Sequence, residues 1–541
     1  MSWKLENIYI NFFEFGNQKN MKNKMIKRAI MEGVNMNRNK QIKLGATLSY
    51  ISIAINIIAG LLYTPWMIEQ IGDGQYGLYT LANSIITLFL VDFGLSTATT
   101  KFVSKYRAEG NEEKANNFLG AIYKLYLLID AIIFTILIVV FFLSDSIYAN
   151  LTPTELQQFK VVYVISALFA VVNFPFVTLN GILTANEKFI PLKLADVIYR
   201  VLYVGMTVIA LLLGYGLYAL VTVHAIAGLL IIVYKLIVIK KTTGTKPNFK
   251  YQDKSIYKDI FSLSIWMTIA TLAQRLIFNI TPTILGITIK ENTSETIAIF
   301  GVITTIEAYI YTFTTAINGM FMPKISRIYA NKNSEEAIMP LMIKVGRFQY
   351  VLNGLMIVGF FTVGQLFVGL WMGDAYSLSY FGVLLVIIPG LFYNSMQIAN
   401  TTLIVRDKAY VSAIVNTVIG VINIVLSFIL SIKFGVIGAC VSIFVAYTVR
   451  FVLYLILFKT TLKLNMALFV KECYIKMGIP LVISASVGYF IKSYLTANSW
   501  WSLLICGALI SITYAVLVGL MGTSKAEKKM LIVRIKKMLK K

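Results

Sequence analysis

The stretch FLGAIYKLYLLIDAIIFTILIVVFFL, residues 118–143, decides the structural class of this protein. Only two of its residues are charged, Lys124 and Asp130. About 20 apolar residues cross the roughly 30 Å hydrocarbon core of a bilayer as a helix. Such a helix satisfies its own backbone hydrogen bonds where no water is present. The stretch is therefore predicted to be a membrane-spanning helix.

The same pattern recurs along the chain and predicts an all-α polytopic membrane protein with about fourteen transmembrane helices. Hydrophobic residues make up 58% of the sequence and charged residues 14%, against roughly 25% charged in soluble domains. The predicted spans are roughly 44–68, 78–100, 118–143, 159–184, 194–213, 217–239, 260–287, 297–322, 341–370, 378–404, 410–432, 436–458, 473–491 and 501–521.

The basic residues lie almost entirely in alternate gaps between these spans. A net charge of +24 would suggest nucleic acid as a partner of a soluble protein. Here only Lys290, Lys433 and Lys492 fall in the gaps of the other set. The positive-inside rule then places both termini in the cytoplasm, in a multi-pass protein of the cytoplasmic (inner) membrane. The cations are expected to contact anionic lipid headgroups, and no nucleic acid is expected.

The spans divide the chain into segments with distinct roles. We predict a basic cytoplasmic segment (1–43), an N-lobe of six helices (44–239), a basic cytoplasmic linker (240–259), a C-lobe of six helices (260–458), helices thirteen and fourteen (459–524) and a basic cytoplasmic tail (525–541). Met36 opens MNRNKQIKLG, a complete basic flank for the first helix. We therefore expect residues 1–35 to be dispensable, with the true start at Met36 or the segment forming a tail.

An internal repeat relates the two lobes. KFVSKYRAEGNEE (101–113) follows the second span and KISRIYANKNSEE (324–336) follows the eighth, at an offset of 223 residues. ANEK (185–188) and VRDK (405–408) match at an offset of 220. Six spans per lobe give both lobes the same topology, which predicts a parallel repeat around a central cleft.

Three further stretches make the chain resemble a known family. They are YTPWMIEQIGDGQYGLYTL (63–81), DFGLSTATTKFVSKYRAEGNEEKANNF (92–118) and LNGILTANEKFIPLKLADV (179–197). Over residues 44 to about 460 the sequence resembles the polysaccharide flippases, of the O-antigen and capsule repeat-unit type, within the multidrug/oligosaccharidyl-lipid/polysaccharide exporter superfamily. Lys101 stands where many relatives are expected to carry Arg.

The resemblance implies a twelve-helix core in two lobes around a lumen for an isoprenoid-pyrophosphate-linked oligosaccharide. It also implies membrane lipid as surroundings and suggests other polysaccharide assembly proteins as partners. Neither a catalytic role nor a bound cofactor is expected, apart from H⁺ or Na⁺ as a coupling ion.

Ionisable and amide residues inside the spans are the candidate site, because such residues usually face a bundle interior or a water-filled cavity. Cations would bind a pyrophosphate or an acidic sugar, amides would bind sugar hydroxyls, and carboxylates would bind the coupling ion. The substrate candidates are Arg275, Arg450, Arg200, Lys344, Arg347, Asn394, Gln397 and Asn416. The ion-coupling candidates are Asp92, Glu307, Asp130 and Asp196.

Several of these residues have structural alternatives. Asp196 and Arg200 are spaced i,i+4 and can pair locally, and Arg275 can pair with Glu307 on the next helix. Lys344 and Arg347 can snorkel to the inner surface. The amide stripes, which include Asn400 and Asn423, can hold helices together. His224 is expected to have a structural role. Pro282 and Pro389 are expected either to break or to kink their helices.

Two other functions compete with a flippase. A multidrug exporter of the same superfamily would favour an acidic, aromatic cavity, whereas this chain has at least as many deep arginines as acids. A membrane enzyme, such as a polymerase or glycosyltransferase, would need a sizeable extramembrane loop or a metal-binding carboxylate cluster, and the sequence offers neither. The single histidine and the distant Cys440, Cys473 and Cys506 predict no metal site and no disulfide framework.

Overall fold

The computed structural model describes residues 38–251, 255–315, 321, 325, 328, 334–406, 408–494 and 499–522. Met36, much of the repeat stretch 324–336 and the tail 525–541 lie outside these residues. In the described part every regular element is a helix. The N-terminal half contains α2 (Arg38–Ile71), α3 (Asp73–Phe89), α4 (Leu95–Ala108), α5 (Glu112–Ile147), α6 (Pro153–Asn173), η1 (Phe174–Val177), α7 (Thr178–Ala185), α8 (Phe189–Leu212) and α9 (Gly216–Thr242).

The C-terminal half continues in the same way. It contains α10 (Ser255–Phe278), α11 (Thr281–Thr288), α12 (Thr293–Thr315), α14 (Ser334–Met372), η3 (Asp374–Tyr376), α15 (Leu378–Asn394), α16 (Gln397–Val405), α17 (Ala409–Thr461), α18 (Met466–Phe469), η4 (Val470–Ile475), α19 (Lys476–Tyr494), α20 (Trp500–Leu517) and η5 (Val518–Gly522).

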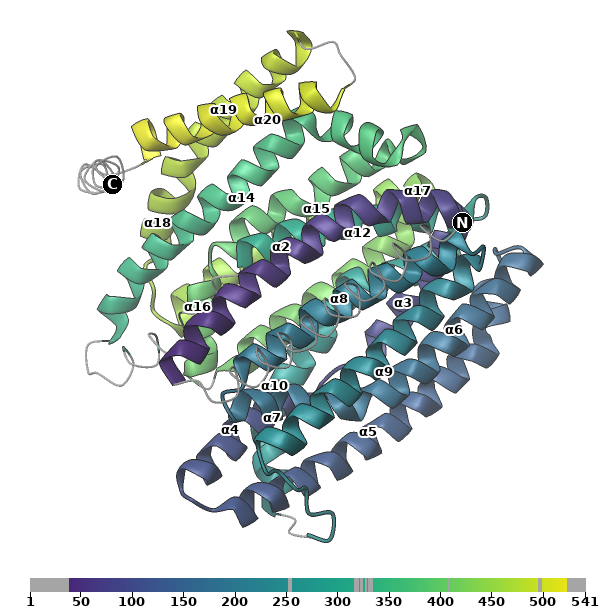
Figure 1. The fold of residues 1–541 in the computed structure, drawn as a ribbon. Helices are drawn as coiled ribbons and strands as arrows, with labels where there is room; N and C mark the ends of the chain where they lie inside the picture. Colours follow the sequence, from purple (N-terminus) through teal and green to yellow (C-terminus); the bar gives the residue numbers. More distant parts are fainter. Residues whose placement is uncertain are drawn as a thin grey trace, which may run out of the picture.

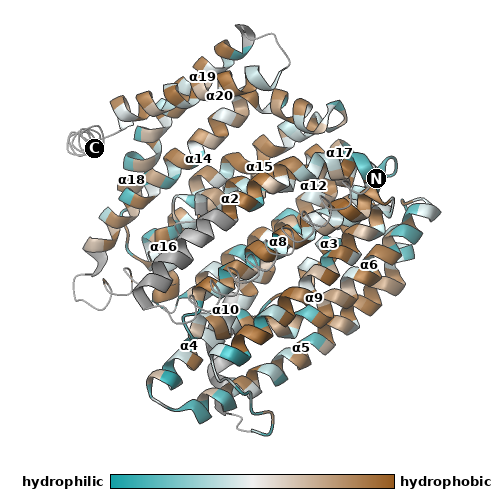
Figure 2. Ribbon diagram, viewed as in Figure 1, coloured by the Kyte–Doolittle hydropathy of each residue, from teal (hydrophilic) through white to brown (hydrophobic). Residues whose placement is uncertain are grey.

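The predicted fold class, an all-α polytopic membrane protein, is confirmed. Among the described residues, ten helical stretches are long and apolar enough to span a membrane. Nine of them each match one predicted span, and α17 contains two. The remaining three predicted spans correspond to α2, to α3 with α4, and to α10 with α11, so the count of fourteen stays a prediction. Apolar residues run along the helices, and hydrophilic residues gather at helix ends such as the α4–α5 turn (Figure 2).

Helices of each half pack mainly with one another. In the N-terminal half α8 packs against α2 and α9, and α6 packs against α3 and α9. In the C-terminal half α17 packs against α10, α11 and α15, and α15 also contacts α12 and α14. The main contact between the halves is α3 against α12 (Figure 1). The exact boundaries of the two lobes remain a prediction.

Helices α19 and α20 form a hairpin at the edge of the molecule. Both α19 and α20 pack against α14 (Figure 1). Arg347 of α14 donates a hydrogen bond of 2.8 Å to the Gly522 carbonyl and lies 4.0 Å from Glu472. The hairpin is therefore attached to the C-terminal half and lies apart from the contact between the halves.

Several predicted spans are interrupted within the membrane. The second span breaks at residues 90–94, where Phe93 and Gly94 have φ angles of 52° and 67°. The seventh span breaks between Phe278 and Thr281, immediately before Pro282, which lies in the first turn of α11. Pro389 instead lies inside α15, and the tenth span breaks later, at residues 395–396. Pro282 therefore marks a break, and Pro389 does not end its helix.

The eleventh and twelfth spans are continuous in α17 but reverse direction at Gly435, whose φ is 58°. Ser442 donates a hydrogen bond of 3.0 Å to Asn423 Oδ1 across this reversal. A Cβ atom at Gly438 would overlap the Leu430 carbonyl. The close approach shows that the two parts of α17 run side by side.

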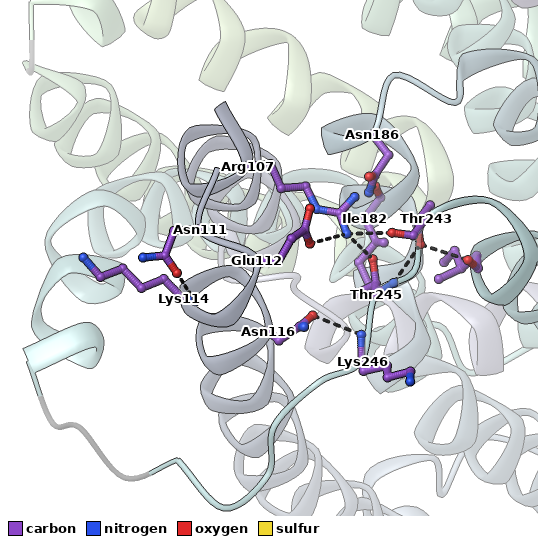
Figure 3. A network of polar contacts seen from close by, with 11 residues as sticks. Arg107, Asn111, Glu112, Lys114, Asn116, Ile182, Asn186, Thr243, Thr245 and Lys246 are labelled. Carbon is purple, nitrogen blue, oxygen red and sulfur yellow. Dashed lines mark hydrogen bonds and ion pairs between the residues drawn. The ribbon is translucent and has the colours of Figure 1, made fainter. Parts of the chain in front are cut away.

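The linker after α9 folds back onto the N-terminal half (Figure 3). Arg107 donates to the Thr243 carbonyl at 2.7 Å and to Thr245 Oγ1 at 3.0 Å, and it pairs with Glu112 at 3.1 Å. Asn248 N–H donates to the Asn116 carbonyl at 2.9 Å. The first part of the linker is thus held by α4 and α5.

Hydrogen bonds between the two halves gather at the helix ends predicted to face outside. Asn150 donates to the Ile287 carbonyl at 2.7 Å, and Ser294 donates to Glu155. Tyr376 donates to Asp73 at 2.7 Å. In addition, Trp371 Nε1 donates to the Leu61 carbonyl at 2.6 Å. The two halves are in contact at this end of the molecule.

Candidate functional site

A cavity of about 270 Å³ lies inside the C-terminal half. Five helices line it: α10, α12, α14, α15 and α17, together with the start of α16. The lining is rich in amide and tyrosine side chains. Its polar and aromatic members are Thr271, Gln274, Glu307, Tyr311, Asn353, Tyr393, Asn394, Gln397, Asn400, Asn416, Tyr447 and Arg450.

Arg450 is the cation of this cavity and is only 3% exposed. The guanidinium carbon lies 3.6 Å from the centre of the Tyr393 ring and 5.2 Å from that of Tyr447. A third ring, Tyr454, lies 5.9 Å away. The buried Nε atom has no hydrogen-bond partner among the residues that the structure describes. Tyrosine faces attract the cation and fix the plane of the guanidinium, while a donor is left over for another acceptor.

Glu307 of α12 lines the same cavity. Within the described part of the chain, ion pairs within 4.0 Å include neither Glu307, Arg450 nor Arg275. The predicted Arg275–Glu307 pair is therefore not formed in this structure. A cavity that holds one cation and one carboxylate without joining them keeps both available to a ligand or an ion.

The amide side chains in and near the cavity have two roles. Asn416 donates to the Ala270 carbonyl at 3.3 Å, yet its Oδ1 is buried without a partner. Asn423 donates to the Leu276 and Ile277 carbonyls, at 3.3 and 3.1 Å, and does not line the cavity. Asn423 thus holds α10 and α17 together at the break in the seventh span, whereas Asn394 and Gln397 line the cavity.

A second polar cluster lies at the break in the second span. Tyr126 of α5 donates a hydrogen bond to Asp92 Oδ1, and the Ser96 N–H donates to Oδ2 at 3.2 Å. Asp130, one turn after Tyr126, is 8% exposed, and its Oδ1 is buried without a partner. Residues 90–94 are not helical, and this break positions Asp92 so that its carboxylate accepts a hydrogen bond from the Ser96 N–H at the start of α4.

Asp196 and Arg200 do not form the local pair that their spacing suggested. Asp196 pairs instead with Lys193 at 3.2 Å. Arg200 donates to the Asn56 carbonyl of α2 at 3.4 Å, and its Nε is buried without a partner. A Cβ atom at Gly60 would lie 3.2 Å from Arg200 Nη2 and would overlap Tyr309 of α12. Arg200 therefore lies beside the contact between the halves.

The remaining cations occupy different places. Arg275 lies on α10 next to the cavity residue Gln274, and its Nη1 is buried without a partner. Lys344 is exposed on α14. Arg347 faces the C-terminal hairpin through Gly522 and Glu472. The structure thus brings Arg450, Glu307, Asn394, Gln397 and Asn416 together and leaves Lys344 and Arg347 outside the cavity.

The sequence-based reasoning missed the tyrosines around Arg450. Tyr447, Arg450 and Tyr454 are spaced i, i+3 and i+7, so they share one helix face. Gln274 was also missed, although its Nε2 donates to Tyr447 Oη at 2.9 Å. The helical spacing of Tyr447 and Tyr454 around Arg450 could have predicted that they share a helix face with it. The sequence has no such signal for Tyr393, because this residue lies on another helix.

The polysaccharide biosynthesis protein family model matches residues 43–329, more than half of the chain. The chain belongs to this family. The resemblance drawn from the stretches 63–81, 92–118 and 179–197 is thereby confirmed. No curated protein matches the sequence.

Solved structures of transporters share the fold of this family member. The lipid II flippase MurJ in an inward closed conformation matches with a TM-score of 0.69 at 16% identity, covering 87% of this chain and 98% of the other. An inward-facing multidrug resistance MATE family transporter of the MOP superfamily gives 0.60 at 11% identity, covering 81% and 99%. A MOP superfamily transporter from Pyrococcus furiosus gives 0.58 at 13% identity, covering 80% and 97%.

Proposed function

We propose that this protein is a flippase that moves a lipid-linked oligosaccharide repeat unit from the inner to the outer leaflet by alternating access. Family membership supports a role in polysaccharide biosynthesis, and the fold is shared with the lipid II flippase MurJ. The single observation that carries the proposal is Arg450, a buried arginine in a polar cavity that is paired with no carboxylate of the described residues. An anionic, hydroxyl-rich substrate would complement this cavity.

Alternating access would require the contact at the outer helix ends to open. In the present state the halves meet there through Asn150, Tyr376 and Trp371. We assign the inner cell membrane as the location, with both termini cytoplasmic, because of the distribution of loop cations. The repeat unit would belong to an O-antigen, a capsule or a related glycan, and other assembly proteins would supply and remove it.

Coupling to H⁺ or Na⁺ would supply the free energy of transport. Asp92 is the first candidate, since its carboxylate lies at an interrupted helix and accepts hydrogen bonds from Tyr126 and Ser96. Glu307 is the second, because it lines the cavity that contains Arg450. No residue is assigned a catalytic role.

Deletion of the gene followed by analysis of lipid-linked repeats in each leaflet tests the proposal. We expect repeat units to accumulate on the inner side, and a copy of the wild-type gene to restore their export. An unchanged leaflet distribution would contradict the proposal.

The alternative is a multidrug or cation antiporter of the same superfamily. Glu307 in an aromatic cavity favours it, and so does the fold shared with MATE transporters. Arg450 opposes it, because a cationic drug would lie beside a buried positive charge. Dye accumulation in the deletion strain, with normal lipid-linked repeats, would support this alternative.

A further inference from the structure

The size of the C-terminal cavity limits what it can bind. Its volume of about 270 Å³ lies near the lower end of the roughly 300–1,000 Å³ of pockets for drug-sized ligands. One sugar ring can occupy this volume, and the rest of a longer oligosaccharide would extend beyond the residues that line it.

The lining has the chemistry that a sugar ring requires. Tyr311 lines the cavity and is 46% exposed, so part of its ring offers an apolar surface to a sugar face. Amides of Asn394, Gln397 and Asn400 contribute from the α15–α16 break. An amide side chain both donates and accepts, as a sugar hydroxyl does. The lining thus offers both aromatic and hydrogen-bonding side chains.

Arg450 adds a requirement for negative charge. The tyrosine faces at 3.6 and 5.2 Å hold its guanidinium in place without neutralising it. Arg450 lines the cavity, and no carboxylate of the described residues lies within 4.0 Å of it. A carboxylate can accept two parallel hydrogen bonds from a guanidinium, so an oxyanion on the ligand would pair with this arginine.

Glu307 controls how strongly an anion is held. The charged groups that line the cavity are Glu307 and Arg450, and the other titratable groups are Tyr311, Tyr393 and Tyr447. An ionised Glu307 repels a second anion in the same small cavity. A protonated Glu307 removes that repulsion and can donate a hydrogen bond. Anion binding should therefore weaken as rising pH ionises Glu307.

We propose that this cavity is a subsite for one sugar ring that carries a single negative charge, a uronate-type carboxylate, within the transported repeat unit. The inference rests on the proposed transport function for its biological context. The site itself can be tested without transport. The other source of an oxyanion is the pyrophosphate of the lipid carrier, and the experiment separates the two.

The test is equilibrium binding to the purified full-length protein in lipid nanodiscs. The probes are D-glucuronate, D-glucose and inorganic pyrophosphate, each titrated at acidic and alkaline pH. We expect D-glucuronate to bind at least roughly tenfold more tightly than D-glucose, as a charge-assisted pair requires. Equal binding of the two sugars, or a preference for pyrophosphate over D-glucuronate, would overturn the proposal.

Variants assign the effect to the two charged residues. Arg450→Gln should remove the preference for D-glucuronate while D-glucose binding remains. Arg450→Lys should keep part of it, since a point charge replaces the fork, and it serves if the Gln variant does not fold. Glu307→Gln should tighten D-glucuronate binding severalfold and flatten its pH dependence. Lys433→Gln, which removes an exposed cation elsewhere, should change nothing.

The outcomes also separate this inference from the transport proposal. An unchanged preference in Arg450→Gln would exclude the subsite even if the deletion strain accumulates lipid-linked repeats on the inner side. Conversely, a charge-selective cavity in a protein whose deletion leaves those repeats unchanged would retain the site and reject the flippase assignment.

Discussion

At the scale of residues, Asp92 shows how a local irregularity exposes a functional group. Its carboxylate accepts from Tyr126 and from the Ser96 N–H because the helix is interrupted at residues 90–94. Asp130 lies one helical turn beyond Tyr126 on α5. A carboxylate in this setting can alternate between an ion-loaded and an empty state.

Asp92→Asn should therefore abolish ion-dependent transport while preserving the fold, because the amide keeps the size of the side chain but not its charge. The measurement is ion-driven transport in proteoliposomes, with protein abundance and thermal stability as controls. Tyr126→Phe should reduce transport less, since the carboxylate would remain. Normal ion dependence in Asp92→Asn would move the coupling role to Glu307.

Arg275→Ala should strongly reduce export with wild-type abundance in the membrane. A mid-span charge costs at least about 2.5 kcal/mol on insertion scales, and Nη1 of Arg275 is buried without a partner. Arg275→Lys should recover export only in part. Exchanging Arg275 and Glu307 should not restore it, because the two residues form no ion pair. The measurement is export by each variant expressed in the deletion strain. Full export by Arg275→Ala would exclude Arg275 from the transport mechanism.

The sequence could predict which polar residues lie in the membrane, but not which of them meet. Arg450, Asn394, Gln397 and Asn416 were expected in a lumen, and they share a cavity with Glu307. Arg347 was expected there too but contacts Gly522. Depth along a span can be read from hydropathy, whereas the direction of a side chain depends on how neighbouring helices pack.

At the scale of elements, the contact of α3 with α12 depends on glycine. A Cβ atom at Gly77 would overlap the backbone of Ser294, and one at Gly301 would lie 2.8 Å from Thr80 Oγ1. These glycines allow the two helices to approach closely. The contact joins the halves at the end predicted to face outside.

Gly77→Leu should therefore favour the state in which the outer ends are separated. Overpacking costs roughly 1–3 kcal/mol, which corresponds to about a 5- to 150-fold shift in the equilibrium. The measurement is labelling of Thr80→Cys by a membrane-impermeant maleimide added outside, which should become faster. The control is Gly205→Leu, where nothing lies within 4 Å of the added Cβ. Equal labelling rates would contradict the prediction.

Hydropathy located the helices but missed their interruptions. Residues 90–94 read Leu-Val-Asp-Phe-Gly, which is nearly as apolar as the flanking helices, because an interrupted backbone inside a bundle is still shielded from lipid. The reversal at Gly435 within α17 fell between two predicted spans and was anticipated. Breaks near Pro282 had a visible signal, whereas the break at residues 395–396 had none.

At the scale of the whole molecule, the orientation in the membrane is the most direct test. We expect Lys290→Cys to be labelled from outside intact cells and Lys250→Cys only after permeabilisation, because loop cations mark the cytoplasmic side. Both positions are exposed. The native Cys440, Cys473 and Cys506 are buried, so their background labelling should be low. Labelling of Lys250→Cys in intact cells would contradict the predicted topology.

Because the linker is anchored to the first half, the two halves could be expressed as separate polypeptides. Lys124 donates to the Tyr251 carbonyl at 2.8 Å, and a Cβ atom at Gly120 would overlap the Asn248 carbonyl. The linker is therefore anchored to the first half up to Tyr251. Two polypeptides divided after Tyr251 should assemble when co-expressed and co-purify through their outer helix ends, whereas division before Thr243 should deprive the first of the contacts that Arg107 makes.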